Sequence, residues 1–584
     1  MTSSDDEQRY RSGVVPLTIG VTGHRDLVHS ELPLLRERVQ TLFEYLTHRF
    51  PDRPLRILSP LAEGADRLVA KVALEMNLNI TVVLPMPASL YVDDFEDDSS
   101  RQEFEELCSR AVDVLELSVL RGASSTQVAE RGPFRDRQYA QLGVFLCAHS
   151  HILLALWDGK PSEEIGGTAQ VVRFHHHDVM AGYAEAEQIN QQILADDDSD
   201  LVYHIVVSRQ REGGAPREGL RALNSFWYTL DDTSMPLEEL PEKYVDIFVR
   251  TAAFNSDAQR FAHQIATEAY PLIDRKAALA LPRSVVRIDR FFRAADWLAI
   301  RYQRLYVRAL KITHVFIFAM AVMLIFYSDV TASKILVGAF AVVMAAAYAV
   351  TSVASRGMWH QKYLEYRTLA EGLRVQFYWA AAGVTSDDVT KFSHENFLQK
   401  QDIELGWIRN VMRVAGIACD VAPSRDPEGL KFVLEEWIGD ERRRGQLKYF
   451  RSKAAQNIAR SQAIDDLGKV ISVGVVLLLV GSVFAPNDTL RTACFVVLGI
   501  VLLIIGVREA YAFRVAEKEV IRQYEFMHRI FSNASKRLEI ATDDAERRRI
   551  LRVLGEAALN EHAEWILIHR ERPLSGSQLW RVET

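Results

Sequence analysis

Four long apolar runs in the second half of the chain constrain its fold more than any other feature. Each run lacks Asp, Glu, Lys and Arg, and with its flanks each approaches the roughly 20 residues that a helix needs to cross a bilayer core. The runs are Ile312–Tyr327, Ile335–Val353, Val470–Ala485 and Ala493–Val507. A buried core helix is the alternative for the first run, but two runs joined by a short loop form a natural helical hairpin. The sequence therefore predicts two hairpins, with transmembrane helices at about 309–328, 335–353, 469–486 and 492–508.

The two pairs of runs repeat one architecture. A polar helix at about 284–308 precedes the first pair, Lys448–Leu467 precedes the second, and a long charged helix, Arg508–Leu538, follows. This pattern indicates an internal duplication of helical units. We expect a disordered N-terminus (1–13), an α/β domain (14–283), a first membrane unit (284–380), a cytosolic helical insert (381–446), a second membrane unit (447–540) and a C-terminal helical tail (541–584).

Charge predicts the orientation in the membrane. The two loops inside the hairpins carry one basic residue each, Lys334 and Arg491, whereas Arg and Lys are plentiful on the opposite flanks. Met1–Arg11 is polar and acidic and has no apolar stretch typical of a signal peptide. The positive-inside rule then places both termini and the α/β domain in the cytoplasm. We expect a multi-pass membrane protein.

The overall charge argues against one large class of partners. The net charge is -8 at neutral pH and the pI is about 6.1, whereas a general nucleic-acid binder usually carries a basic face. The four cysteines are scattered and match no metal-ligand spacing, which indicates reduced thiols in a cytosolic setting. We expect no nucleic-acid partner and no metal.

The first 210 residues alternate between strand and helix patterns. Strands are predicted at Leu17–Val21, Leu55–Ser59, Ile80–Leu84, Ile152–Trp157 and Val202–Ser208. Helices are predicted at Leu32–Phe50, Ala65–Glu75, Arg101–Leu117 and Arg137–Ala148. This alternation predicts a Rossmann-like α/β domain with a doubly wound, mostly parallel sheet, in front of an all-α C-terminal region. In such sheets ligands bind beyond the carboxyl ends of the strands.

Small-residue turns follow several of these strands and open helices. Gly23 and Gly64 let a backbone approach a phosphate closely, and Arg25 adds a charge-assisted contact. Asp66 either caps its helix or accepts a hydrogen bond from a ribose or base. Each turn alone is equally consistent with a purely structural role, but three turns at the strand ends of one sheet favour a nucleotide or phosphate site. The candidate ligand-binding residues are Gly20, Thr22, Gly23, His24, Arg25, Ser59, Leu61, Glu63, Gly64, Ala65, Asp66, Pro85, Tyr91, Phe95, Arg135, Trp157, Asp158, Gly159, Gly166, Gly167 and Thr168.

Two resemblances extend this interpretation. Thr22-Gly23-His24-Arg25, Ser59–Asp66 and Gly166-Gly167-Thr168 resemble the SLOG superfamily, which includes DprA, the LOG cytokinin-activating enzymes and the N-terminal domains of TRPM channels. The resemblance covers about residues 14–280 and implies a ligand-binding site at these turns. The remainder is similar to SLATT domains, two-helix membrane modules found beside SLOG sensors in bacterial conflict systems. Their proposed activity is to form pores in response to nucleotide signals.

One departure from the family pattern bears on catalysis. LOG enzymes use a Glu shortly after the glycine-threonine turn to hydrolyse an N-glycosidic bond, but Gln170 stands here, and an amide is neither a carboxylate acid nor a base. The resemblance therefore favours a sensor without a required cofactor, binding a cyclic nucleotide or an ADP-ribose-like molecule. We expect binding to drive homo-oligomerisation and to permeabilise the bilayer in antiviral defence. The alternative is a membrane-tethered nucleotide N-glycosidase or NAD-consuming hydrolase.

Overall fold

The computed structural model describes residues 13–95, 97–120, 122–184, 199–230, 238–273, 281–385, 397–398, 403–421, 425–439 and 445–570. The chain divides into two compact units. The first contains residues 1–294 and 372–426, and the second contains residues 295–371 and 427–584. The predicted segment 1–13 lies almost entirely outside the described residues, as does 571–584.

A seven-stranded sheet forms the centre of the first unit, in the order β4-β3-β2-β1-β5-β6-β7. Its strands are β1 (Leu17–Gly23), β2 (Leu55–Ser59), β3 (Asn79–Leu84), β4 (Asp113–Glu116), β5 (Ile152–Trp157), β6 (Val202–Val206) and β7 (Ser225–Tyr228). All neighbours pair in parallel except β6 and β7. The chain runs outward from β1 to β4 and then returns to β5 on the other side of β1. This reversal confirms the predicted Rossmann-like fold and defines its switch point between β1 and β5.

Helices cover both faces of the sheet, because right-handed crossovers that run in opposite directions place their helices on opposite sides. The crossovers that lead outward from β1 contain α2 (Leu32–Arg49), α3 (Ala65–Glu75) and α5 (Asp98–Arg110). Those on the β5 side contain α7 (Pro133–His149) and α8 (Thr168–His177), which pack on β5 through a core that includes Val144, Leu153 and Val171. The central strands are buried on both faces, and most of their residues are apolar.

The predicted C-terminal bound of one helix was wrong. The sequence pattern predicted a helix over Arg101–Leu117, but α5 ends at Arg110 and residues 113–116 form strand β4. The side chains of β4 alternate between half-buried and exposed, as expected for an edge strand that carries Asp113 and Glu116. Strand β7, which also lies at an edge, was not predicted from the sequence.

Two further helices belong to the first unit and cover the amino ends of the strands. Helix α9 (Glu242–Arg260) holds the start of β1, because the side-chain amide of Asn255 donates to the Val15 carbonyl and its oxygen accepts from the Val15 amide. Helix α15 (Gly406–Val421), in the predicted insert, accepts a hydrogen bond from the His151 Nε2–H at the Asn410 carbonyl, at 3.1 Å. The segment 381–446 therefore contributes α15 to the core of the α/β unit.

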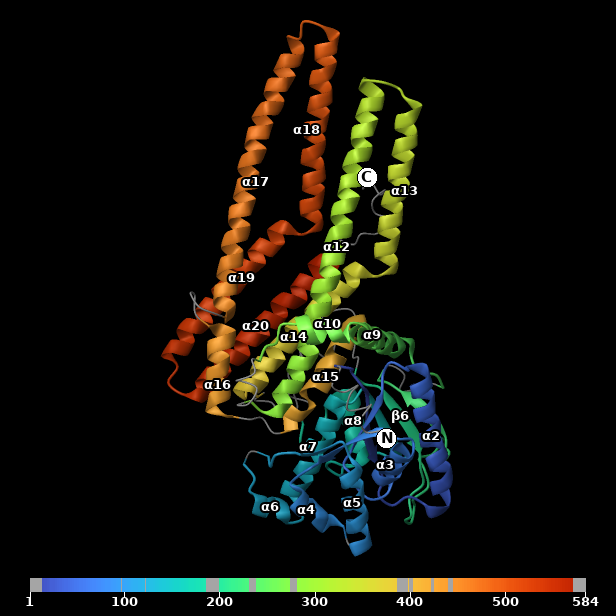
Figure 1. Ribbon diagram of the computed structural model, residues 1–584. Coiled ribbons are helices and arrows are strands. Elements are labelled where there is room, and N and C mark those ends of the chain that lie inside the picture. Colours follow the sequence, from blue (N-terminus) through green and yellow to red (C-terminus); the bar gives the residue numbers. More distant parts are fainter. Residues whose placement is uncertain are drawn as a thin grey trace. The chain divides into compact units, whose positions relative to one another are not determined.

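The second unit is helical. Figure 1 shows its two hairpins, one made by α12 (Arg283–Asp329) and α13 (Lys334–Arg356) and the other by α17 (Gly445–Val483) and α18 (Asp488–Arg514). Among the described residues, four helical segments are long and apolar enough to cross a membrane: Ser284–Asp329, Lys334–Ala382, Gly445–Val483 and Asp488–Arg514. The apolar windows are mostly exposed in the structure, which suits a lipid environment.

Polar helices complete the second unit. They are the first part of α14 (Trp359–Ala382), α16 (Pro427–Val433), α19 (Glu517–Ile540) and α20 (Asp544–Arg570). The predicted charged helix Arg508–Leu538 is not continuous, because Ala516 adopts a left-handed conformation (φ 51°) between α18 and α19. A left-handed residue cannot continue a right-handed helix, so the chain changes direction there.

Candidate functional site

The predicted turns meet at the carboxyl ends of β1, β2 and β5. Thr22 and Gly23 pair in register with Ala155 and Leu156, and the His24 amide donates to the Leu156 carbonyl at 3.1 Å. The loop after β1 therefore starts at the switch point, where the crossovers diverge and leave room for a ligand.

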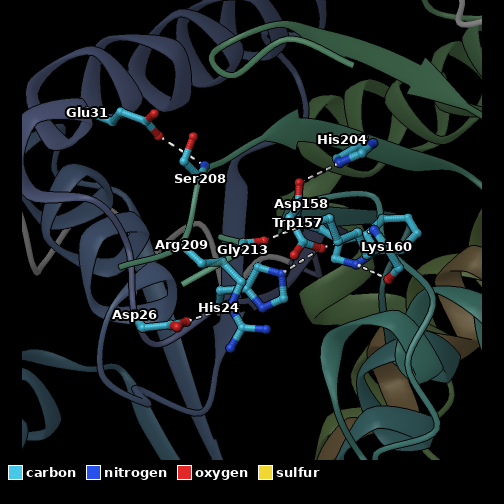
Figure 2. A network of polar contacts seen from close by, with 10 residues as sticks. All are labelled: His24, Asp26, Glu31, Trp157, Asp158, Lys160, His204, Ser208, Arg209 and Gly213. Atoms are coloured by element: carbon cyan, nitrogen blue, oxygen red, sulfur yellow. Dashed lines mark hydrogen bonds and ion pairs between the residues drawn. The ribbon is translucent and has the colours of Figure 1, made fainter. Parts of the chain in front are cut away.

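A polar network ties the loops that follow β1, β5 and β6 (Figure 2). The His24 Nε2 lies 3.2 Å from Asp158 Oδ1, and the Arg209 Nε donates to Asp26 Oδ1 at 2.8 Å. The His24–Asp158 contact has the distance of an ion pair without the alignment of a hydrogen bond. Burial lowers the pKa of His24, the Arg209 charge lowers it further, and Asp158 opposes both. His24 is therefore mainly neutral at pH 7.

The same network fixes the loop after β6. The Ser208 amide donates to Glu31 Oε2 at 3.0 Å, and Lys160 Nζ donates to the Gly213 carbonyl at 2.7 Å (Figure 2). The His204 Nε2–H donates to the Trp157 carbonyl at 2.9 Å, and burial lowers the pKa of His204 to about 4. Neutral His204 thus anchors the end of β5 from the neighbouring strand.

The turn before α3 packs closely against the turn after β1. Gly64 has φ +78°, and a Cβ there would lie 2.2 Å from the Arg25 carbonyl oxygen. A Cβ on Gly23 would lie 2.4 Å from the Cβ of Ala65, whose amide donates to the His24 carbonyl at 3.1 Å. Small residues are therefore required here by the contact between the two turns. The N-terminus of α3 faces the backbone of His24 and Arg25.

Asp66 is the unusual group of this turn. Its side chain is only 4% exposed, and its Oδ1 makes no hydrogen bond to any residue that the structure describes. Burial raises the pKa of Asp66 to about 7, while Arg25, the Ala62 amide and Arg67 act in the opposite direction. A buried carboxylate with an unsatisfied oxygen is costly unless a partner reaches it. Asp66 is therefore suited to accept a hydrogen bond from a ligand.

Tyr91 is a second group of this kind. It is fully buried, and within the described ranges its hydroxyl has no hydrogen-bond partner. Burial raises its pKa, and the charges that act on it include Arg25 and Asp66, so these three side chains are neighbours. Arg25 itself is exposed, with its guanidinium 5.7 Å from the centre of the Tyr139 ring. Arg25 is therefore an exposed, long cationic side chain whose charge acts on two buried groups, Asp66 and Tyr91, that each have an unsatisfied polar atom.

The third predicted turn, Gly166–Thr168, contacts Tyr139, and the Tyr139 ring lies near Arg25. Gly166 has φ +73°, and a Cβ on it would lie 2.6 Å from the Cβ of Tyr139, whose ring lies near Arg25. Gly167 is the N-cap of α8, which begins at Thr168. The N-termini of α3 and α8 thus both lie in the region around Arg25.

Several other predicted residues have structural partners. Arg135 is paired with Asp94 at 3.0 Å, and Glu63 accepts a hydrogen bond from Ser100. Phe95 is fully buried beneath Arg67, whose guanidinium lies 4.6 Å from its ring centre. These contacts stabilise the wall of the site.

The remaining predicted residues also lie in the fold framework. Gly20 lies inside β1 against Ser150, and Gly159 (φ +77°) packs against Leu220. The Pro85 carbonyl accepts a hydrogen bond from the Gln138 side chain. The Ser59 hydroxyl accepts a hydrogen bond from the Leu61 amide. Thr22 is buried at the end of β1. Trp157 Nε1 donates to the Lys160 carbonyl at 3.1 Å. These residues shape the strand ends, and the Ser59 and Trp157 side chains are bonded within the fold.

Gln170 has a structural explanation. Its Nε2 donates to the Ser162 carbonyl at 2.5 Å, and its Oε1 accepts from the Ala181 amide at 3.3 Å. The side chain is 1% exposed. Gln170 therefore joins the loops before and after α8, a role for which an amide with one donor and one acceptor end is suited.

Sequence reasoning missed Arg209, Asp26 and Tyr139. The signal for Arg209 was available, because the loop after β6 must end at the same sheet edge as the loops after β1 and β5. Tyr139 had no such signal, since it lies inside α7 and reaches Arg25 only through packing.

His175 and His176 pack within the fold, whereas His177 is exposed. The His175 Nε2–H donates to the Leu201 carbonyl at 3.2 Å, and the His176 ring lies 4.6 Å from that of Tyr228. Among the described residues, no three His, Cys, Asp or Glu side chains gather in a way that would hold a metal ion.

A search against protein-family models and a search of curated proteins found no match for this chain. Any functional conclusion therefore depends on the chemistry of the site rather than on relatives.

Proposed function

We propose that this chain is a membrane-anchored sensor-effector that binds a nucleotide-derived signal in its SLOG-like α/β unit. The observation that carries the proposal is the pair of buried, unsatisfied atoms, Asp66 Oδ1 and the Tyr91 hydroxyl, below the exposed Arg25. This combination offers one cation, one carboxyl group and one hydroxyl at the sheet edge where ligands of doubly wound folds bind.

The three groups suit the parts of a nucleotide. Arg25 and the N-termini of α3 and α8 provide positive charge and amide donors for phosphate. Asp66, when ionised, accepts hydrogen bonds from ribose hydroxyls or a base N–H, and the Tyr91 hydroxyl can donate or accept. A cyclic nucleotide or an ADP-ribose-like molecule contains both kinds of group.

The output in this proposal is the membrane unit. Ligand binding changes helix packing only if the ligand prefers one packing state over another. In the proposed state the chains oligomerise and permeabilise the bacterial inner membrane as part of antiviral defence. The basic flanks of the apolar helices support an orientation in which both termini and the α/β unit face the cytoplasm.

The test uses the full-length protein in liposomes that contain a trapped dye. A panel of ADP-ribose, NAD and cyclic nucleotides is added, and affinity is measured by calorimetry alongside dye release. We expect one member to bind, and Arg25→Ala to weaken that binding at least tenfold and to prevent dye release at the same concentration. Binding and release that are unchanged in the Arg25→Ala and Tyr91→Phe variants would refute the proposed site, whereas binding without release would refute the effector output.

A specific observation also favours an enzyme as a second candidate. A buried carboxyl group whose pKa is raised to about 7 is suited to act as a general acid or base near neutral pH. The activity would then be nucleotide N-glycosidase or NAD hydrolysis. Chromatographic detection of free base after incubation of the full-length protein with NAD distinguishes this candidate, provided that Asp66→Asn abolishes the release.

A further inference from the structure

The two hairpins of the second unit meet along α12 and α18. A Cβ on Gly499 of α18 would lie 3.3 Å from Cδ1 of Ile325 on α12, so the helices touch there. At the other end of this contact, Tyr511 packs against a buried cluster that contains Tyr306 and Leu310. Helices α12 and α18 are therefore in contact at two places that are several turns apart along each helix.

Between these two contacts lies a cavity of about 260 Å³. Its walls come from one face of α12 and one face of α18. The lining residues are Thr313, His314, Ile317, Leu503, Gly506, Val507, Ala510 and Arg514. The missing side chain of Gly506 helps to leave this space open, since a larger residue there would extend toward α12.

The polar residues of α12 present few free donors to the cavity. The Thr313 hydroxyl donates to the Ala309 carbonyl at 2.9 Å. The His314 Nδ1 lies 2.8 Å from the Leu310 carbonyl, and since a carbonyl only accepts, Nδ1 carries the hydrogen. The cavity is thus apolar along most of its length, and a space of this character does not hold water well.

Arg514 gives the cavity one charged end. It is the last residue of α18, next to the basic flank that the positive-inside rule assigns to the cytoplasmic surface. Leu503 lies eleven residues earlier on the same helix, which corresponds to about 16 Å at 1.5 Å per residue. The cavity therefore extends from the depth of lipid headgroups to the depth of acyl chains.

We propose that this cavity holds one acyl chain of an anionic phospholipid, with the lipid phosphate against Arg514. An acyl chain matches the narrow apolar lining, and an anionic headgroup matches the charge at its end. The bound lipid joins the two hairpins. This proposal does not depend on the nucleotide site.

The experiment uses full-length protein that has been delipidated in detergent and then mixed with equal amounts of phosphatidylglycerol and phosphatidylcholine. Native mass spectrometry counts the lipids retained by each chain. Gly506→Leu fills the cavity, and Gly481→Leu is its control, because Gly481 lies on α17 outside the cavity lining, while a Cβ at either glycine has nothing within 4 Å. Arg514→Gln removes the charge, and Arg491→Gln is its control in the first turn of α18, at the opposite end of the helix.

We expect the native protein to retain phosphatidylglycerol at least tenfold more than phosphatidylcholine. Gly506→Leu should lose this retained lipid, and Arg514→Gln should lose the preference between the two lipids, while both controls behave as the native protein does. Retention in Gly506→Leu equal to that in Gly481→Leu would overturn the site. Should Gly506→Leu fail to elute as a monodisperse species, Arg514→Gln decides: an unchanged preference overturns the proposal.

Discussion

The imidazole of His24 and the carboxylate of Asp158 meet across the boundary between β1 and β5, with Nε2 3.2 Å from Oδ1. This boundary is where the strand order reverses, so the contact joins the two halves of the sheet at the mouth of the candidate site. Asp158 also accepts a hydrogen bond from the Lys160 amide at 3.1 Å, which holds the loop after β5 in place.

Replacing Asp158 with Asn should lower the pKa of His24 further. Asp158 is among the groups that raise this pKa against burial, and Asn keeps the acceptor for the Lys160 amide while removing the charge. NMR titration of labelled histidine in the full-length protein measures the change. The control is Asp466→Asn, an exposed carboxylate on α17. An unchanged His24 titration would show that the two side chains do not interact in solution.

Asp66→Asn should stabilise the protein at pH 8 while weakening ligand binding. The folded-state pKa of Asp66 is about 7 against 3.8 in the unfolded chain, so its contribution to stability is present at low pH and is lost as pH rises toward 7. Removal of the buried charge should add about 1–3 kcal/mol to the free energy of unfolding at pH 8. Denaturant unfolding at pH 8 and pH 4 checks this, and a stability gain of equal size at both values would contradict it.

Gly64→Ala should disrupt the two glycine turns. The added Cβ would lie 2.2 Å from the Arg25 carbonyl oxygen, in a backbone conformation (φ +78°) that disfavours side chains. Gly213→Ala provides the matched control, since Gly213 has φ +71° but nothing within 4 Å of its Cβ position. The control should cost about 1 kcal/mol and Gly64→Ala at least about 2 kcal/mol more. Thermal unfolding of both variants measures the difference; equal losses would mean that the turns do not pack as described.

The loss of stability in acid should depend in part on His204. Its folded-state pKa is about 4 and its unfolded value 6.5, so the unfolded chain binds a proton that the native chain excludes between these values. The contribution of His204 to the free energy of unfolding therefore falls as pH decreases from about 6.5 to 4, by up to about 1.4 kcal/mol per pH unit. Asp66 acts in the opposite direction over much of this range, so the total need not fall.

The His204 contribution is isolated by comparison with His204→Gln. The side-chain amide of Gln can still donate to the Trp157 carbonyl but does not titrate. Denaturant unfolding of both proteins from pH 7 to pH 4 should show a difference that grows with acidity in favour of the variant. A constant difference over that range would argue against a buried neutral His204.

A fragment that ends at residue 283 should fold poorly. It lacks α15, whose Ile417 and Val421 pack in one core cluster with Leu58 and Phe145. The His149 and His151 side chains would also lose their bonds to the α15 backbone. Exposure of this surface should make the fragment aggregate, as judged by size-exclusion chromatography, whereas a fusion of 1–294 to 372–426 should remain soluble. Equal solubility of the two fragments would contradict the role of α15.

The central strands were predictable from sequence because both of their faces are buried. β2 and β5 were predicted with their observed bounds, since short and largely apolar runs bounded by turn residues are typical of such strands. The edge strands β4 and β7 were missed: they are short, and one of them follows α5 after only two residues. An edge strand needs only one neighbour, and that neighbour is not visible in its own sequence.

The turns of the candidate site could also be predicted from the sequence, but the pairing of its polar side chains could not. Glycines at strand ends indicate close approach of backbones, and Gly23 and Gly64 do approach one another's loops. Sequence could not show that Arg135 is paired with Asp94 while Arg25 is exposed, because both are arginines near a helix start. The unsatisfied atom of Asp66 depends on residues from several segments and emerges only when they pack.

The turn between β2 and α3 has a kinetic consequence for recognition. Two of its residues, Leu61 (φ 56°) and Gly64 (φ +78°), hold left-handed conformations, and Leu61 is fully buried with its carbonyl bonded to Arg67 Nε at 3.0 Å. The turn is therefore ordered before any ligand arrives, and little conformational entropy is lost on binding. In the proposed site, association of a ligand should then be limited by diffusion and orientation, and the lifetime of the complex should determine how well the ligand is distinguished from its analogues.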